Sequence, residues 1–301
     1  MQSLHRFRIR NWPLYTMILP GLIYFVVFKY IPLSGSIIAF QDYNVFDGVW
    51  GSSFVGLKHF INLFTYPEFY SVLTNTVLIS LYKLFFGFPA PILLALLLNE
   101  VRKVLFKRTI QTVLYLPHFL SWVIAGGLII NFLSPSSGIV NEWIRSFCSE
   151  PIFFLQEPKY FRTIIVGSGI WKEVGWNTII YLAALAGINP DLYEAAEVDG
   201  AGKLRQAFSI TIPSLLPTII VLLLLNIGHI LDLGFEQIYM FLNPLVYETG
   251  EVFDTYIYRI GLLGGQFSYT TAIGIFKSIV GFILLFGANY LSKKMTDHSI
   301  F

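Results

Sequence analysis

The chain has 301 residues, of which 55% are hydrophobic and 13% are charged, and its formal net charge is +2. Soluble domains carry about 25% charged residues, so this composition excludes a soluble globular enzyme and indicates a protein embedded in lipid. The one cysteine, Cys148, excludes an intramolecular disulfide, and we interpret it as a small apolar filler.

Apolar stretches long enough to cross a bilayer occur six times in the sequence. A spanning helix needs about 20 mostly apolar residues, and pattern alone places its ends to within about 2–4 residues. The first stretch follows three arginines, as in a signal peptide, but more spans follow and no small-residue cleavage site closes it. We interpret it as an uncleaved span. The predicted spans cover approximately residues 14–40, 71–98, 109–133, 163–187, 213–238 and 271–291, of which the fourth is the most polar.

The basic residues that flank these spans are distributed unevenly between the two sides of the membrane. One side carries eleven: Arg6, Arg8, Arg10, Arg102, Lys103, Lys107, Arg108, Lys203, Arg205, Lys293 and Lys294. The other side carries five, diluted by acidic residues over longer loops: Lys58, Arg145, Lys159, Arg162 and Arg259. Because cytoplasmic loops carry the excess of Lys and Arg, we expect both termini in the cytoplasm, which agrees with an even number of spans.

The loops on the opposite side, at about 41–70, 134–162 and 240–270, are long and rich in aromatic residues. Trp and Tyr are typical of the belt at a membrane interface. The same side chains could also receive a partner outside the membrane, and both interpretations stay open. The residues concerned are Trp50, Trp143, Tyr160, Tyr247, Tyr256 and Tyr258.

Residues 189–212, between the fourth and fifth spans, form the most distinctive polar segment of the chain. Asn189 or Asp191 can cap the start of a helix, and good helix formers continue from there to Glu197. Glycines at positions 200 and 202 then end this helix. The pattern predicts a short helix that stops at a glycine corner on the cytoplasmic side of the membrane.

A second short helix is predicted over about residues 203–210, and Pro213 then starts the fifth span. Leu204, Ala207 and Phe208 share one of its faces, which we expect to pack on the spans. An interfacial helix would explain this amphipathic pattern. It would not explain acidic residues near an anionic membrane surface, or the glycine corner. The segment is therefore a candidate docking element for a soluble partner.

The fourth and fifth spans contain polar residues that are costly in a membrane and are therefore functional candidates. Aromatic faces stack on sugar rings and polar groups bond to hydroxyls, so this mixture suits a path for a polar, neutral or acidic solute. The alternative is contact between helices, including a Lys172–Asp232 ion pair. The candidates are Lys172, Glu173, Trp176, Asn177 and Tyr181 in the fourth span, and Asn226, His229, Asp232 and Glu236 in the fifth.

Spacing and neighbours suggest arrangements for several of these side chains. His229, Asp232 and Glu236 of the fifth span are spaced by three and four residues, so we expect them to form a single stripe. Lys277 could approach Asp254 or Glu236. Lys29 and Lys83 could either snorkel to the membrane interface or pair inside the protein. His118, which follows a proline, is interpreted as a structural hydrogen-bonding residue.

Motifs for catalysis or cofactor binding are absent from the sequence. It contains no G-x-x-x-x-G-K-[ST] phosphate loop, no HExxH, no paired Cys/His metal pattern and no G-x-S-x-G. Basic residues are too dispersed to bind nucleic acid. We therefore expect no catalytic residue, no metal and no cofactor in this chain, and any ATP and magnesium are used by another chain.

The run Glu194-Ala195-Ala196-x-x-Asp199-Gly200-Ala201, followed by Phe208, Ile210, Pro213 and Pro217, resembles the E-A-A-x-x-D-G-A signature of type I ABC importer permeases. Across nearly the whole chain the sequence also resembles the polysaccharide-type permeases of Gram-positive bacteria. The segments that carry this second resemblance are Phe28-Lys29-Tyr30-Ile31-Pro32, Phe88-Pro89-Ala90-Pro91, Tyr115-Leu116-Pro117-His118 and Asn131-Phe132-Leu133-Ser134-Pro135.

The resemblance implies an all-α membrane protein with six transmembrane helices, both termini inside, and a coupling helix between spans four and five. It implies one permease domain over residues 1–301, with a core at about 71–292 and a coupling segment at 189–212. In that family the segment seats in a groove of the ATPase subunit. The docking role passes to Glu194, Ala195, Ala196, Asp199, Gly200, Ala201, Lys203 and Arg205.

The resemblance also implies an ATP-driven importer of an oligosaccharide in the bacterial cell membrane, of a Gram-positive organism. Its implied partners are a second permease chain in a heterodimer, two ABC ATPase subunits and an extracellular substrate-binding lipoprotein. Alternatives are an ABC importer for a non-sugar solute, an ion-coupled secondary transporter and a membrane-embedded enzyme. A secondary transporter would predict inverted repeats and broken helices, and neither is evident in the sequence.

Overall fold

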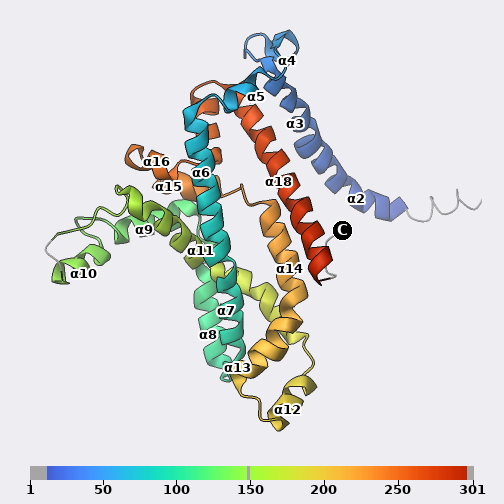
Figure 1. Cartoon of the computed structure of the whole chain (residues 1–301), viewed down its shortest axis with the longest axis vertical. Helices are drawn as coiled ribbons and strands as arrows, with labels where there is room; N and C mark the ends of the chain where they lie inside the picture. Colours follow the sequence, from blue (N-terminus) through green and yellow to red (C-terminus); the bar gives the residue numbers. More distant parts are fainter. Residues whose placement is uncertain (1–11, 148–149, 297–301) are drawn as a thin grey trace, which may run out of the picture. The chain divides into compact units, whose positions relative to one another are not determined.

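A computed structural model describes residues 12–147 and 150–296, which are largely helical (Figure 1). The arginines before the first span and Cys148 lie outside the described residues. The chain divides into two compact units. The first comprises Met1–Tyr66 with Arg259–Phe276, and the second comprises Pro67–Tyr258 with Lys277–Phe301.

The first unit begins with the first predicted span, which is confirmed as one helical stretch over Leu14–Phe40. After it, two short strands pair antiparallel, and Lys58 Nζ contacts Asp42 Oδ2 at 2.7 Å. The Lys58 ammonium beside Asp42 lowers the pKa of that carboxyl. The elements are α2 (Trp12–Phe25), η1 (Val26–Tyr30), α3 (Ile31–Ser34), η2 (Gly35–Phe40), β1 (Gln41–Asp42), α4 (Gly48–Gly51), β2 (Ser53–Phe54) and α5 (Lys58–Leu63).

The second unit is built around the long helix α11 (Pro158–Ala186), which contains the predicted fourth span. It packs against the helices of the second span, α6 (Pro67–Tyr82), η3 (Lys83–Gly87) and α7 (Pro89–Asn99). Among the described residues, four helical stretches are long and apolar enough to cross a membrane, or five if one bent pair counts as a span. The helix α11 is not among them, and its polar residues account for that.

The third predicted span is not the single helix that the sequence predicted. Helix α8 (Val104–Tyr115) and the 3-10 turn η4 (Leu116–Phe119) meet α9 (Trp122–Phe132) at a bend of 104°. Backbone at Leu120 and Ser121 is extended, and the Ser121 hydroxyl accepts from the Ile124 N–H at 3.3 Å. A new N-cap therefore ends one helix and starts the next.

The fifth predicted span ends earlier in the chain than expected. One helical stretch runs through α13 (Lys203–Gln206), η5 (Ala207–Thr211) and α14 (Ile212–Gly228), and residues 229–234 then leave the helix before α15 (Phe235–Phe241). Carbonyls freed there find side-chain donors, since Ser80 donates to Ile230 O and Lys83 Nζ donates to Leu233 O at 2.7 Å. Such pairing lets backbone unwind at membrane depth.

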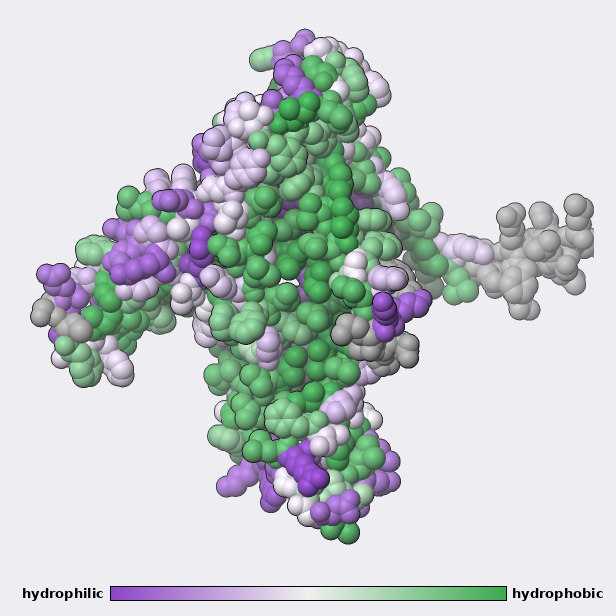
Figure 2. Space-filling model, in the orientation of Figure 1, coloured by the Kyte–Doolittle hydropathy of each residue, from purple (hydrophilic) through white to green (hydrophobic). Residues whose placement is uncertain are grey.

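The remaining elements complete the two units. Helix α18 contains the sixth predicted span and belongs in part to each unit. Hydrophilic residues gather around α12 and α13, and apolar surface dominates along the long helices (Figure 2). The elements are α10 (Ile139–Phe147), α12 (Asp191–Val198), η6 (Pro244–Val246), α16 (Tyr247–Gly250), α17 (Phe253–Tyr256), η7 (Ile257–Leu263) and α18 (Phe267–Thr296).

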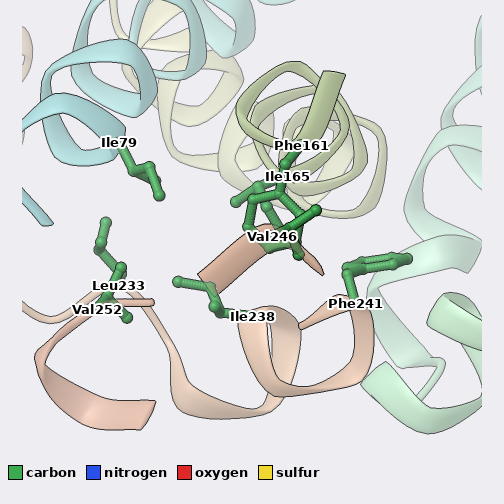
Figure 3. Packing of buried hydrophobic residues seen from close by; sticks show 8 residues of the cluster. All are labelled: Ile79, Phe161, Ile165, Leu233, Ile238, Phe241, Val246 and Val252. Atoms are coloured by element: carbon green, nitrogen blue, oxygen red, sulfur yellow. The ribbon is translucent and has the colours of Figure 1, made fainter. Parts of the chain in front are cut away.

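The principal buried cluster of the second unit ties the unwound segment to α6 and α11 (Figure 3). Phe161 and Ile165 of α11 are fully buried, as is Ile79 of α6. Burying a large apolar side chain stabilises a fold by about 1.5–3 kcal/mol. The cluster therefore holds residues 233–252 in place although only short helices form there. Its other members are Leu233, Ile238, Phe241, Val246 and Val252.

Candidate functional site

The polar segment between the fourth and fifth spans is a rigid corner made by a glycine-terminated helix. Asn189 Oδ1 accepts from the Asp191 N–H at 3.1 Å at the start of α12. At its other end Gly200 has a φ of 76°, a left-handed conformation that favours glycine. The N–H groups of Gly200 and Ala201 return to Glu197 O and Ala196 O at 3.0 and 2.8 Å, which forms a Schellman motif.

Side chains on both sides of this corner hold it closed. Lys203 Nζ donates to Glu197 Oε1 at 2.9 Å, and this bond lowers the pKa of the Glu197 carboxyl. Buried Gln206 donates to Ala201 O at 3.1 Å. The Tyr193 hydroxyl lies 3.0 Å from Thr211 Oγ1. These bonds connect α12 and the glycine corner to the helix that continues into α14.

The outer face of the corner is only partly the face that the sequence predicted. Two of the three apolar side chains expected to pack on the spans are exposed, Leu204 by 78% and Phe208 by 69%, whereas Ala207 is half-buried. Val198 is also exposed, by 88%. The helix continues directly into α14, and no described residue of this chain covers these side chains. Glu194, Asp199 and Arg205 are also exposed. A mixed apolar and charged surface on a rigid corner is suited to a protein partner.

A cavity of about 450 Å³ opens in the second unit between η3, α7, α9, α11, α14, the unwound segment and the start of α15. Five residues predicted for the solute path line it together: Glu173, Asn177, Tyr181, Asn226 and Asp232. Phe88 and Trp122 add aromatic faces to the lining. Lys83 and Gln237, which were not predicted as path residues, line the same cavity.

Four other predicted path residues do not line this cavity. Lys172 is buried, and its Nζ donates to His118 O at 2.9 Å and to Glu173 Oε1 at 3.0 Å. Trp176 stacks on His118, with ring centroids 4.4 Å apart and planes 3° apart. His229 and Glu236 are exposed. The predicted stripe of three residues is wrong because the helix ends at Gly228.

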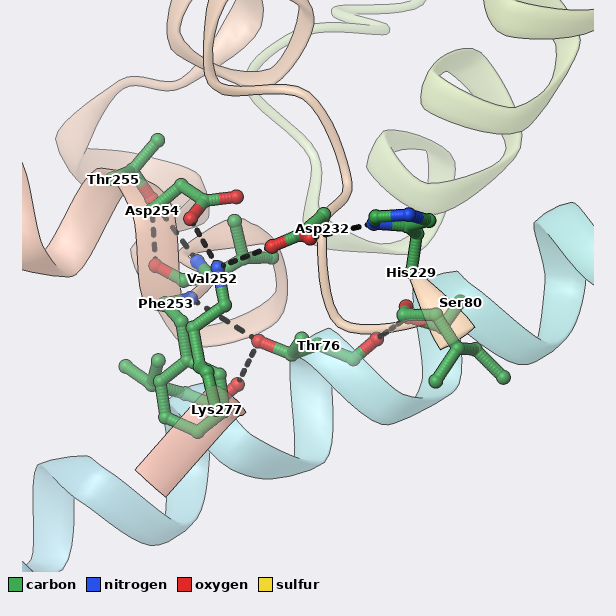
Figure 4. A network of polar contacts seen from close by, with 11 residues as sticks. Thr76, Ser80, His229, Asp232, Val252, Phe253, Asp254, Thr255 and Lys277 are labelled. Atoms are coloured by element: carbon green, nitrogen blue, oxygen red, sulfur yellow. Dashed lines mark hydrogen bonds and ion pairs between the residues drawn. The ribbon is translucent and has the colours of Figure 1, made fainter. Parts of the chain in front are cut away.

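The predicted Lys172–Asp232 ion pair does not form, because Lys172 pairs with Glu173 and Asp232 pairs with Lys277. Lys277 Nζ lies 2.9 Å from Asp232 Oδ1 and 2.5 Å from Asp254 Oδ1 (Figure 4). The approach of Lys277 to Asp254 is confirmed, whereas Glu236 takes no part in this contact. Thr76 Oγ1 of α6 accepts from the Phe253 N–H at 3.2 Å in the same network.

The Glu173 carboxylate, which also lines the cavity, has contacts at both of its oxygens. Glu173 Oε1 accepts from Lys172, and Oε2 lies 2.7 Å from His118 Nδ1. His118 therefore has the structural hydrogen-bonding role expected of it. Within the described residues no group of three or more His, Cys, Asp or Glu side chains could hold a metal ion. The lining therefore combines charged, amide and aromatic groups.

Lys83 and Gln237 form a hydrogen-bonded pair on the cavity wall. Lys83 Nζ donates to Gln237 Oε1 at 2.7 Å. Gln237 Nε2 donates in turn to Ile165 O at 2.6 Å and to Ser168 Oγ at 3.0 Å. The position of Lys83 within an apolar span was a sequence signal that could have identified it as a functional candidate. Gln237 could not be assigned, because its approach depends on the unwinding after Gly228.

Comparison with known proteins places this architecture in one family. The model of the family "Binding-protein-dependent transport system inner membrane component" matches residues 87–297. The polygalacturonan/rhamnogalacturonan transport system permease protein YteP of Bacillus subtilis (strain 168) is 53% identical over 288 residues, which cover 96% of this chain and 90% of that protein.

Two solved structures resemble this chain over almost its whole length. One is a bacterial ABC transporter involved in the import of the acidic polysaccharide alginate, with a TM-score of 0.90, 43% identity and coverage of 98% of this chain and 99% of that chain. The other is a bacterial alginate ABC transporter in complex with an alginate pentasaccharide-bound periplasmic protein, with a TM-score of 0.89, 44% identity and coverage of 97% of each chain. This chain therefore belongs to the family of binding-protein-dependent transport system inner membrane components, the permease subunits of ABC importers.

Proposed function

We propose that this chain forms part of the translocation path for an oligosaccharide in an ATP-driven importer. The observation that carries the proposal is the cavity, in which Asn177, Tyr181 and Asn226 lie beside two carboxylates and an ammonium group. Sugar hydroxyls are both donors and acceptors, and they need partners of both kinds. Aromatic rings at Phe88 and Trp122 suit the apolar faces of sugar rings. Relatives named for the transport of polygalacturonan and alginate support the same solute class.

The chain crosses the membrane six times in this proposal, with both termini in the cytoplasm. Helix α11 serves as the fourth span, and its polar residues face the cavity and its neighbours instead of lipid. The pair α8 and α9 serves as a bent third span. Residues 1–301 act as one permease domain, with a core at about 71–292 and a coupling segment at 189–212.

The coupling segment transmits the movement of a nucleotide hydrolase to the spans. Exposed Glu194, Asp199 and Arg205 surround apolar side chains on the corner between α12 and α13. ATP-driven closure of two ATPase subunits would move this corner as a lever, and the packed spans would switch between two arrangements. ATP can shift that equilibrium only by its differential affinity for the two states.

The partners of this assembly are a second permease chain, two ABC ATPase subunits and an extracellular binding lipoprotein that delivers the saccharide. The chain itself is not an enzyme, because ATP hydrolysis belongs to the ATPase subunits. The assembly lies in the cell membrane of a Gram-positive bacterium. A solved relative bound to a saccharide-loaded periplasmic protein supports the delivery step.

Purification of the protein from native membranes, followed by reconstitution in proteoliposomes, tests this proposal. The expected result is a stoichiometric ATPase in the complex and saccharide uptake that requires internal ATP. Uptake that is abolished by ionophores while ATP is present would instead favour an ion-coupled transporter. ATP-dependent uptake of peptides but not of saccharides would favour a non-sugar solute.

An ion-coupled transporter can no longer be set aside for lack of broken helices. The 104° bend at Leu120–Ser121 and the unwound residues 229–234 are interruptions of this kind. Family membership, together with the exposed corner at α12 and α13, favours the ATP-driven mechanism.

A further inference from the structure

We propose that Lys83 is a specificity-determining residue that binds a carboxylate group of the transported saccharide, so that the cavity selects an acidic, uronate-type oligosaccharide. This inference rests on the proposed function and deepens it, because it names the substrate class. Lys83 lies at the start of the π-helical turn η3, where the second span passes the cavity.

Lys83 is held in place before any solute arrives. Its ammonium group donates to Leu233 O and to Gln237 Oε1, each at 2.7 Å. Gln237 is fixed by its own bonds to Ile165 O and Ser168 Oγ of α11. An ammonium group that is already fixed loses little rotamer freedom when it binds an anion, and such preorganisation increases affinity.

The ammonium group retains capacity for a ligand. A lysine has three N–H donors, and the described residues accept two of them from Lys83. Both acceptors are neutral oxygens, and no described carboxylate lies within 4.0 Å of Lys83 Nζ. A charged acceptor would make the stronger, charge-assisted hydrogen bond.

The other lysines near the cavity are already engaged by carboxylates. Lys172 pairs with Glu173 at 3.0 Å, and Lys277 bridges Asp232 and Asp254. The three lysines, with Lys83 included, equal the three carboxylates Glu173, Asp232 and Asp254 in number. Lys83 is nevertheless not paired with any of these carboxylates. Lys83 supplies a positive end, whereas Asp232 and Glu173 supply negative acceptors on the same lining.

A uronate sugar is complementary to this separation of charge. Its carboxylate would accept from Lys83, and its hydroxyls would donate to Asp232 and Glu173. A neutral sugar would leave the third N–H of Lys83 without a charged acceptor. A cationic solute would meet the same ammonium group as a like charge.

The test compares Lys83→Gln and Lys83→Arg with the unaltered chain in the complete transporter, reconstituted with its ATPase and binding protein. The probes are a galacturonate trisaccharide and its fully methyl-esterified form, which has the same backbone without charge. Each variant is expressed as a ratio to the unaltered chain for each probe, so the preference of the binding protein cancels. Lys58→Gln, at an exposed lysine outside the cavity, is the matched control.

Lys83→Gln is expected to lower uptake of the trisaccharide by about tenfold to a hundredfold, the usual effect of losing a charged hydrogen bond. Uptake by Lys83→Arg is expected to stay within about threefold of the unaltered chain, because the charge remains. Where the ester is transported, Lys83→Gln should change its uptake by less than about threefold. Recovery of each complex with its ATPase subunits verifies assembly.

Trisaccharide uptake by Lys83→Gln within about threefold of the unaltered chain would overturn the inference. Equal losses in Lys83→Gln and Lys83→Arg, or equal losses for trisaccharide and ester, would assign Lys83 a structural role instead. ATP-dependent uptake of neutral saccharides alone would also overturn it, while the proposed function would stand. If the unaltered chain took up no saccharide, the proposed function itself would fail.

Discussion

Replacing Lys277 by Met removes the ammonium group that bridges Asp232 and Asp254 in the network of Figure 4. The two carboxylates differ in environment, since the side chain of Asp254 is 23% exposed and that of Asp232 is 61% exposed, whereas Lys277 is 11% exposed. The loss of stability therefore comes mainly from Asp254, whose carboxylate stays mostly buried without its partner.

Breaking a buried ion pair by removing one partner costs about 3–5 kcal/mol of folding free energy. Lys277→Met should fall in this range. Asp232→Asn removes a solvent-screened contact and should cost about 0–1 kcal/mol. Asp254→Asn leaves Lys277 paired with Asp232 and should cost about 1–3 kcal/mol. Lys277→Met with Asp254→Asn removes both buried charges, so the double variant should regain most of the loss.

Unfolding of the purified protein in mixed micelles of dodecyl maltoside and SDS measures these free energies. The expected order of cost is Lys277→Met, then Asp254→Asn, then Asp232→Asn, with the double variant closer to the unaltered chain than Lys277→Met is. The reasoning fails if Asp232→Asn costs as much as Lys277→Met, or if the double variant is less stable than both single variants.

Three further variants test packing, docking and the solute path. Gly175→Ala places a Cβ against the backbone carbonyl of Leu114, so it should destabilise the protein by about 1–3 kcal/mol, measured as unfolding of the purified protein. Glu194→Lys together with Gly200→Pro should leave membrane insertion intact and abolish recovery of the ATPase, because the left-handed φ of 76° is incompatible with proline. Trp176→Ala should lower transport more than complex assembly, measured as uptake relative to the amount of assembled transporter.

Each of these predictions has a control and a contrary result. Gly167 lies on the same helix, and a Cβ at this position would have no neighbouring atom within 4 Å, so Gly167→Ala should be neutral. Equal effects at both glycines would contradict the packing argument. Gly202→Ala should preserve ATPase recovery because its φ of −67° suits any residue. Normal ATPase recovery with the double substitution would refute the docking role. Equal loss of transport and assembly in Trp176→Ala would indicate packing instead.

Periodicity and the local chemistry of single segments were sufficient for the long elements. The first predicted span coincides with the helical stretch Leu14–Phe40, and α11 contains the fourth. The glycine corner also followed from sequence, because a left-handed residue at Gly200 needs only local backbone chemistry. The acidic residues on α12 are exposed there, as expected.

Hydrophobic patterning could not reveal where spans break. Apolar residues continue across Leu120–Ser121 and beyond Gly228, so both segments read as single spans. The breaks are stable because distant side chains satisfy the freed backbone, as Lys83 does for the Leu233 carbonyl. Such pairing joins residues about 150 positions apart, and no local signal encodes it.

The sequence by itself determined the membrane class, the location of the long helices and the resemblance of the coupling segment, because these depend on composition and on short-range patterns. Tertiary structure alone decided which polar residues meet. It brought Glu173 and Asp232 together on one cavity, placed Trp176 against His118, and set Lys83 beside Gln237. Helix ends and crossings set those distances, and they arise from packing between segments far apart in the chain.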